Sequence, residues 1–303
     1  MRAARQDWRV KRGSLETLLT RRCHTSVGCS VDSVNAEIAM KEWTMVEQKK
    51  IAVAGATGRL GRHVVDVLVE RGHEVVAFSR ANGVDIESGA GLDEALSGVD
   101  IVIDASSTPS ADQQVATEFF TASARNLHAA GERAGVERLV VVSIIGIDGS
   151  LAGYNAAKLA HEQELLKGAL PVQILRAAQF HELVEVMVGW GTQGDVAYVQ
   201  GMRTQLVAAR TVAEALVDLA MNPIAAEDIP FPEIAGPQPE TMASAAAALI
   251  AARGDALQII ETSDDANPDR EQFENGTLLP SPHATLAGPS FAEWVAATVA
   301  AAR

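Results

Sequence analysis

Cysteine is almost absent from this sequence. The 303 residues include two cysteines, Cys23 and Cys29, and both lie within the first 49 residues. Disulfides, cysteine nucleophiles and cysteine-bound metals are therefore excluded from residues 50–303. The sequence also contains no HExxH or comparable spacing of metal ligands, so we expect no metal site.

Basic residues and long apolar runs are scarce as well. The chain has 25 Lys and Arg against 39 Asp and Glu, which gives a formal net charge of -14. A surface this acidic argues against nucleic-acid binding, because a basic patch supplies most of that affinity. No run of 18 apolar residues occurs, so we expect neither a transmembrane helix nor a membrane partner. The hydrophobic content of 48% is enough for a full core, and we expect a cytoplasmic globular protein.

The first 49 residues differ from the rest. They carry an excess of basic residues and show no sustained period of 2 or 3.6, and they lack the apolar core of a secretory signal. We interpret residues 1–49 as a disordered N-terminal extension, or as residues that precede a later start at Met45. A transit peptide or a nucleic-acid-binding arm is the alternative.

Short apolar strands alternate with amphipathic helices in residues 51–176. The expected strands are 51–54, 74–78, 100–104, 138–143 and 173–176, and the expected helices are 60–71, 91–97, 112–134 and 154–167. Strands that alternate with helices imply right-handed crossovers. The pattern therefore predicts an α/β fold with a doubly wound parallel sheet of the Rossmann type.

The alternation ends near residue 180. Five prolines between residues 223 and 239 indicate irregular connections. The expected elements there are a strand at 195–199 and helices at 211–221, 241–253 and 288–302. We assign residues 50–303 to one dinucleotide-binding domain, in which about 180–303 contribute a smaller C-terminal substrate lobe.

A glycine-rich loop follows the first expected strand and opens the first expected helix. In this position the glycines permit a tight turn and bring backbone amides against a pyrophosphate, which the helix N-terminus also attracts. A glycine-rich turn without a ligand is the alternative. The loop predicts a set of dinucleotide-binding residues: Gly55, Thr57, Gly58, Arg59, Leu60 and Gly61.

The end of the second strand bears on which dinucleotide binds. NAD sites usually place Asp or Glu about 20 residues beyond the loop, where it binds the ribose 2'-hydroxyl. Ser79 and Arg80 occupy that point here. A hydroxyl and a guanidinium suit a 2'-phosphate, and Arg59 is a second cation in the loop. We therefore predict NADP(H). Asp85 is a candidate contact to the adenine or ribose, and it keeps NAD as the less favoured alternative.

Tyr154 and Lys158 are four positions apart and so share one face of an expected helix. A lysine cation beside the phenol would lower its pKa, so that Tyr154 could exchange the proton that accompanies hydride transfer. Ser143 ends the preceding strand, at the sheet edge where ligands bind, and would polarise a substrate carbonyl. A packing role for Tyr154, with a solvated or ribose-binding Lys158, is the alternative.

Two further interpretations concern the second half. His161 and His181 form a rival pair that would flank a substrate. Several apolar side chains form either the wall of a substrate pocket or the buried face of a helix; they are Phe180, Leu183, Val184, Met187 and Trp190.

Together these motifs resemble the atypical short-chain dehydrogenase/reductases, in particular the NmrA-like and NAD(P)H-binding subgroup. The resemblance covers about residues 50–303 and is carried by residues 55–61, 104–110, 142–143, 154–158, 174–182 and 291–294. It implies a Rossmann domain with a smaller lobe and a nicotinamide cofactor. It also places Ala105, Ser106 and Ser107 beside the adenosine, and Ala178 and Phe180 near the nicotinamide.

The sequence thus predicts an NADP(H)-dependent oxidoreductase that transfers a hydride to or from a small carbonyl, quinone-like or alcohol substrate. Tyr154, Lys158 and Ser143 are its candidate catalytic residues, although the spacing from Ser143 to Tyr154 is slightly short for the family. The alternative is a regulatory protein that senses NADP(H) without turnover, because the subgroup includes such members.

Overall fold

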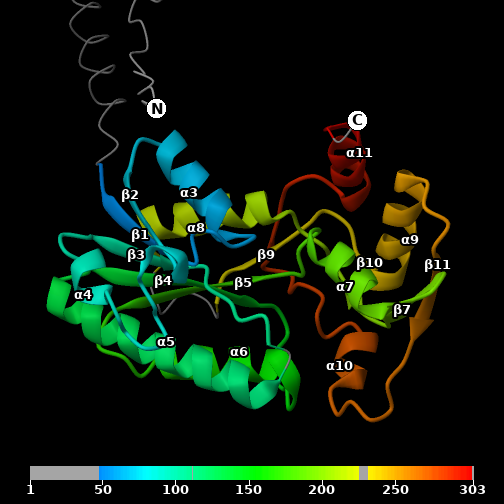
Figure 1. The fold of residues 1–303 in the computed structure, drawn as a ribbon, viewed down its shortest axis with the longest axis horizontal. Coiled ribbons are helices and arrows are strands. Elements are labelled where there is room, and N and C mark those ends of the chain that lie inside the picture. Colours follow the sequence, from blue (N-terminus) through cyan, green and yellow to red (C-terminus); the bar gives the residue numbers. More distant parts are fainter. Residues whose placement is uncertain (1–47, 111, 225–230, 302–303) are drawn as a thin grey trace, which may run out of the picture. The chain divides into compact units, whose positions relative to one another are not determined.

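Seven parallel strands form the central sheet, in the order β12-β9-β5-β4-β3-β1-β2 (Figure 1). They are β1 (Lys50–Ala54), β2 (Glu74–Phe78), β3 (Ile101–Asp104), β4 (Arg138–Ile144), β5 (Val172–Ala177), β9 (Glu233–Ala235) and β12 (Thr285–Leu286). The order reverses at β1 and β3, as in a doubly wound sheet. The predicted α/β fold is confirmed.

The computed structural model describes residues 48–110, 112–224 and 231–301. Of the predicted N-terminal extension, only residues 48 and 49 lie within this range. Both cysteines and Met45 fall outside the described residues.

Helices cover both faces of the central sheet (Figure 1). One face carries α3 (Gly61–Glu70) and α8 (Ala209–Met221), and the other carries α4 (Leu92–Ala95), α5 (Gln113–Ala134) and α6 (Gly153–Leu165). Strand β1 shows why: Ile51 and Val53 pack toward α3 and α8, while Ala52 and Ala54 pack toward α5. Strands buried on both faces read as continuous apolar runs.

A second group of elements lies beyond β5. It comprises α7 (Leu183–Gly191), β6 (Thr192–Gln193), β7 (Val196–Gln200), β8 (Arg203–Thr204), β10 (Glu240–Thr241), α9 (Met242–Arg253), β11 (Gln258–Thr262), α10 (Arg270–Glu274) and α11 (Phe291–Ala301). Strands β11, β7 and β6 form a three-stranded sheet, and β10 pairs with β8. Helices α7, α9 and α11 enclose a separate apolar core with β7.

The C-terminal part is not confined to this lobe. Helix α8 packs on the central sheet, and β9 and β12 extend that sheet past β5. These two strands have three and two residues, too few to produce a recognisable alternation in sequence.

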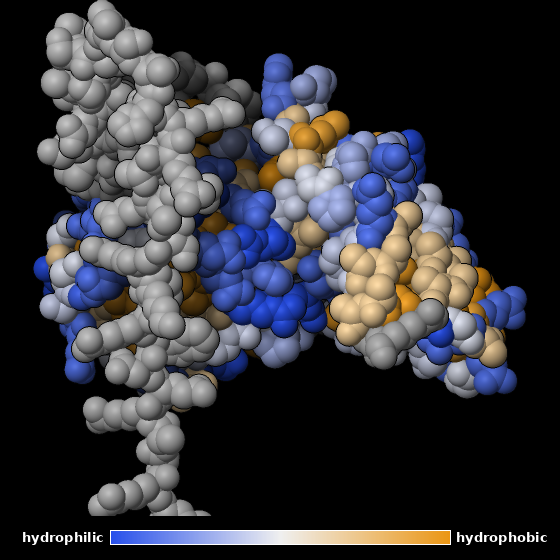
Figure 2. Space-filling model, turned by 90° about the horizontal axis from the view of Figure 1, so that it is seen from above, coloured by the Kyte–Doolittle hydropathy of each residue, from blue (hydrophilic) through white to orange (hydrophobic). Residues whose placement is uncertain are grey.

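Alanine-rich helices reach the surface of the lobe. Figure 2 shows a pale orange area at the C-terminal helix α11, whose Ala292, Ala296 and Ala300 are exposed. The opposite side of α11 buries Phe291 and Val295 against α9. No helix in the described part of the chain is both long and apolar enough to span a membrane.

Candidate functional site

The glycine loop turns sharply between β1 and α3. Gly55 has a φ of 71°, and a Cβ built there would lie 2.7 Å from the Cα of Ser106. A Cβ on Gly61, the first residue of α3, would lie 2.1 Å from the carbonyl oxygen of Gly55. Only glycine therefore fits at either position without moving the backbone. The loop presents the N-terminus of α3 to whatever binds beside it.

A cavity of about 330 Å³ lies against this loop. Its walls come from the loop itself, from the segment after β2 and from the end of β3 with α5. The lining residues are Gly55, Thr57, Gly58, Phe78, Ser79, Arg80, Ala81, Val84, Asp85, Ile86, Ser106, Ser107 and Phe119. Eight residues expected to bind a dinucleotide thus surround one cavity, although they come from three separate segments.

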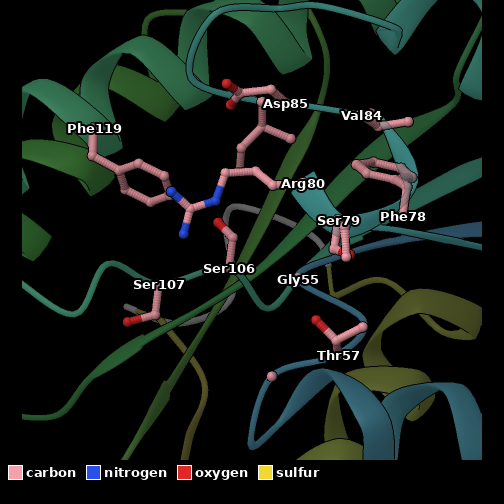
Figure 3. A pocket seen from close by; sticks show the side chains of 13 residues that line it. Gly55, Thr57, Phe78, Ser79, Arg80, Val84, Asp85, Ser106, Ser107 and Phe119 are labelled. Carbon is pink, nitrogen blue, oxygen red and sulfur yellow. The ribbon is translucent and has the colours of Figure 1, made fainter.

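Arg80 extends across this cavity. It begins a short 3-10 helix, η1 (Arg80–Asn82), in which the Asn82 side chain accepts a hydrogen bond from the backbone N–H of Ser79 at 2.7 Å. Figure 3 shows the Arg80 guanidinium directed toward Phe119 and Ser106. In the described part of the chain its side chain has no hydrogen bond or ion pair, so the cation is free to meet an anion. Asp85 lies nearby, with Oδ1 accepting from the backbone N–H of Glu87.

Several expected contacts lie away from the cavity wall. Arg59 is exposed beside the loop, whereas Leu60 is buried in the core with 4% exposure. Gly61 and Ala105 support the loop from behind, and Ala178 is buried at the end of β5. The half-buried Phe180 packs on the core beside α8 and bridges to Val207.

Several apolar residues of the cavity wall could not be predicted from the sequence. Phe119 projects from α5, and Phe78, Val84 and Ile86 supply further apolar contacts. Their apolar spacing reads as helix or strand core, so no local signal marks them as lining residues.

Tyr154 lies in the first turn of α6, and its hydroxyl is 2.8 Å from the Ser107 Oγ. Burial raises the pKa of Tyr154, the hydrogen bond with Ser107 lowers it, and the negative charge of Asp104 raises it. The net shift is upward. The prediction that Lys158 lowers the pKa of Tyr154 is therefore wrong for the protein without a ligand, because the Lys158 ammonium bonds to Val142 and His161 instead.

Lys158 is buried beneath α6 with 4% exposure. Its ammonium donates to the Val142 carbonyl at 2.9 Å and is 2.9 Å from the His161 Nδ1. It also lies 4.5 Å from the centre of the Phe120 ring. Burial lowers the pKa of Lys158 to about 8, against the opposing influence of Asp104 and Glu162. Lys158 can thus change charge within an accessible pH range.

Ser143 sits on the α6 side of β4 with 3% exposure, and its hydroxyl has no hydrogen-bond partner within the described structure. Ser107, and not Ser143, provides the hydroxyl that contacts Tyr154. The reason is that residues 105–107 continue from the neighbouring strand β3 and pass over the first turn of α6. An expected cofactor contact thus also bears on the candidate acid.

The two histidines considered as a rival pair are both buried and belong to different cores. His161 stacks on Phe120, with ring centres 4.9 Å apart. His181 contacts Phe291 and Trp294 in the lobe, and burial lowers its pKa to about 4. They do not face each other across a pocket.

The apolar side chains of α7 mostly follow the helix-face alternative. Val184 is fully buried in the lobe core, and Leu183 and Met187 pack against the same core. Trp190 is 70% exposed.

Helix α6 is held at its N-terminus by a residue far along the chain. It has no side-chain cap of its own. The Asp269 carboxylate accepts from the backbone N–H groups of Leu151 and Ala152 at 2.9–3.0 Å. The Gln113 side chain accepts from Gly153 at 3.1 Å. These contacts fix the turn that carries Tyr154, and Asp269 was not foreseen because nothing in the sequence links it to residue 151.

Comparison with known proteins agrees with this geometry. The NAD(P)H-binding family matches residues 55–223, from the glycine loop to the end of α8. The photosystem II assembly factor Ycf39 of Synechocystis sp. is 32% identical over 110 residues, which cover 32% of this chain. The matched part spans 34% of the length of that relative, about a third.

Solved structures share the fold at low identity. MoeE5, in complex with UDP-glucose and NAD, gives a TM-score of 0.62 at 20% identity, covering 83% of this chain and 97% of that one. A short-chain dehydrogenase/reductase superfamily protein of Agrobacterium tumefaciens with bound NAD gives 0.61 at 20% identity, covering 84% and 97%. The dTDP-4-dehydrorhamnose reductase of Bacillus anthracis, in complex with NADP, gives 0.60 at 15% identity, covering 82% and 98%.

The doubly wound sheet, the glycine loop and the cavity beside it define a nicotinamide-dinucleotide-binding protein of the Rossmann class. Within that class, the chain belongs to the NAD(P)H-binding family. The resemblance drawn from its sequence motifs is confirmed.

Proposed function

We propose that this protein is an NADP(H)-dependent oxidoreductase that acts on a small carbonyl, quinone-like or alcohol substrate. The observation that carries the proposal is the convergence of the cavity beside the glycine loop with the Tyr-Lys pair of α6, in which Tyr154 is half-buried and Lys158 is buried. Ser107 connects the two, since it lines the cavity and also contacts the Tyr154 hydroxyl at 2.8 Å.

The residues present fit a dinucleotide with a 2'-phosphate. The backbone of Gly55, Thr57 and Gly58 lines the cavity beside the N-terminus of α3, where a pyrophosphate would bind. Inside the cavity Arg80 supplies a guanidinium without a hydrogen bond or ion pair to any described residue, and Ser79 adds a hydroxyl beside it. Phe119 and the other apolar lining residues suit the flat face of an adenine.

In this proposal the bound dinucleotide supplies or accepts the hydride. Tyr154 donates its phenolic proton to the oxygen of the reduced substrate, or accepts it in the reverse direction. Lys158, with one ammonium N–H left after its bonds to Val142 and His161, would bind a ribose hydroxyl and stabilise the ionised phenol. Ser107 orients the phenol, and Ser143 remains a candidate to polarise the substrate oxygen.

Activity and binding can be tested together. The protein is titrated with NADPH and NADH, and a panel of carbonyl and quinone compounds is then followed at the nicotinamide absorbance. Tyr154→Phe should reduce kcat by about 100-fold or more, because general acid catalysis contributes that much. Tyr198→Phe is the matched control, since Tyr198 is the other tyrosine and lies 42% exposed on β7. Unchanged turnover in Tyr154→Phe would remove Tyr154 from the mechanism.

One observation favours a second function, a binding protein that senses the redox state of the dinucleotide. Lys158 is bonded to Val142 and His161, while the pKa of Tyr154 is raised, which is the arrangement of a packed and inactive pair. Tight NADPH binding with no turnover of any compound, together with a change in hydrogen exchange between the oxidised and reduced cofactor, would favour this function.

A further inference from the structure

A buried group of ionisable side chains lies beneath α6, behind the Tyr-Lys pair. Asp104 is 2% exposed, His161 1% and Lys158 4%. Burial of a charged or polar group costs free energy unless partners replace the lost water. The arrangement of these three side chains therefore needs an explanation beyond packing.

His161 acts as the acceptor for Lys158. An ammonium has donors only, so the His161 Nδ1 that lies 2.9 Å away must carry a lone pair, and the ring proton is on Nε2. Burial, with a further contribution from Lys158, keeps the pKa of His161 well below its usual value, so that the ring is neutral. The Phe120 ring stacks on the imidazole at 4.9 Å and fixes its plane.

The two carboxylate oxygens of Asp104 face different parts of the site, the His161 ring and the turn at Ser106. Its Oδ2 is 3.7 Å from the His161 Nε2, and neither atom has a hydrogen-bond partner in the described structure. Its Oδ1 accepts from the backbone N–H of Ser106 at 2.8 Å, which holds the turn that brings Ser107 to Tyr154. One carboxylate thus holds the turn that carries Ser107 through one oxygen and faces the His161 ring with the other.

We propose that Asp104 and His161 are positioning residues that set the orientation and charge of Lys158 and align it with Tyr154. The inference rests on the proposed function, in which Tyr154 and Lys158 form the reacting pair. The Asp104 carboxylate faces the protonated Nε2 of His161 at 3.7 Å, and His161 holds the ammonium through Nδ1. The remaining ammonium N–H is left for a ligand hydroxyl.

Among the described residues, two carboxylates influence the pKa of Lys158. Asp104 faces it from β3, and Glu162 lies on α6 itself, bonded to Arg176 of β5. From α5 the facing side chain is Phe120, which carries no charge. Both carboxylates raise the pKa of Lys158, so removal of the Asp104 charge should lower it further.

The cofactor-free protein provides the first test. The ammonium of Lys158 is titrated by NMR in lysine-labelled protein, with Lys158→Met used to assign the signal. Asp104→Asn should lower the Lys158 pKa by about one unit, because a negative charge is lost. His161→Leu should also lower it, because the ammonium loses a hydrogen-bond acceptor. His161→Asn, whose amide oxygen can accept the same hydrogen bond, should restore most of the shift. His128→Leu, which removes a buried histidine bonded to the Leu165 carbonyl, is the matched control and should leave the Lys158 pKa unchanged.

The second test measures cofactor binding and turnover at several pH values. In His161→Leu, NADPH binding should weaken by roughly tenfold. In Asp104→Asn, the alkaline limb of kcat/KM should move to lower pH, whereas a merely structural defect would lower the rate equally at every pH. Lys158 pKa values that are equal in wild type, Asp104→Asn and His161→Leu would overturn the proposal, as would unchanged binding and pH profiles. A wild-type protein that binds neither dinucleotide would instead refute the proposed function, and the NMR result would still decide the positioning roles.

Discussion

Replacing Asp269 by alanine tests how the helix that carries Tyr154 is held. The Asp269 carboxylate is 2% exposed and accepts from two backbone N–H groups at the start of α6. Hydrogen bonds to a charged group contribute about 1.5–3 kcal/mol each, and a buried donor left without a partner costs about 1–3 kcal/mol. Some of this loss is recovered when water enters the vacated space. We therefore expect the free energy of unfolding to fall by about 3 kcal/mol and the melting temperature by roughly 6–12 °C.

The assay combines thermal unfolding with amide hydrogen exchange. Exchange at the Leu151 and Ala152 amides should accelerate in Asp269→Ala more than at amides of the central sheet. Asp265→Ala is the matched control, because Asp265 is 91% exposed and forms only a surface ion pair with Arg270. Such pairs contribute about 0–1 kcal/mol. Equal melting temperatures for the two variants would refute the assigned role of Asp269.

Three further predictions concern the dinucleotide site and its lysine. Arg80→Ala should weaken NADPH binding by about 10–100-fold and leave NADH binding nearly unchanged, since a charge-assisted hydrogen bond is lost only with the 2'-phosphate. Equal losses for both cofactors in isothermal titration would contradict this, and Arg133→Ala, which removes an exposed arginine of α5 outside the cavity wall, is the control. Gly61→Ala should abolish measurable NADPH binding, because its Cβ would lie 2.1 Å from the Gly55 carbonyl oxygen. Gly189→Ala is the control and should bind NADPH normally, because a Cβ added there has no neighbouring atom within 4 Å. The pKa of Lys158 falls from 10.5 to about 8 on folding. The buried ammonium therefore destabilises the folded protein fully below pH 8, and this destabilisation fades as the pH rises toward 10.5. The free energy of unfolding of wild type relative to Lys158→Met should therefore rise by about 2 kcal/mol between pH 7.5 and 9.5 in urea titrations. If this difference in free energy does not change with pH, Lys158 is not buried as a cation.

The elements of the central sheet up to residue 177 could be predicted from the sequence. Strands such as β1 are buried on both faces, and helices such as α5 end at a glycine with positive φ, Gly135, so both leave strong local patterns. The short strands β9 and β12 could not be predicted, because two or three residues carry no period. Their place is decided by pairing with distant segments.

The same contrast holds for the site. The glycine loop and Arg80 were foreseen, because a phosphate loop has a local sequence pattern. The contact between Ser107 and Tyr154 was not, since it depends on how the end of β3 passes over α6. The upward shift in the Tyr154 pKa was also missed, because spacing on a helix does not reveal that Lys158 bonds to His161. A local motif can be recognised in the sequence, whereas a side-chain contact between two distant elements depends on the tertiary structure.

The origin of β9 and β12 has a consequence for how the protein is made. Strand β5 gains its outer neighbour, β9, only when residues 233–235 are present, and β12 comes from residues 285–286. During synthesis the nascent chain therefore emerges from the ribosome with the β5 side of its sheet still unpaired. An open edge of this kind readily pairs with another chain. Completion of the central sheet thus waits for residues that are synthesised well after β5, and the β5 edge stays open to pairing with other chains during that interval.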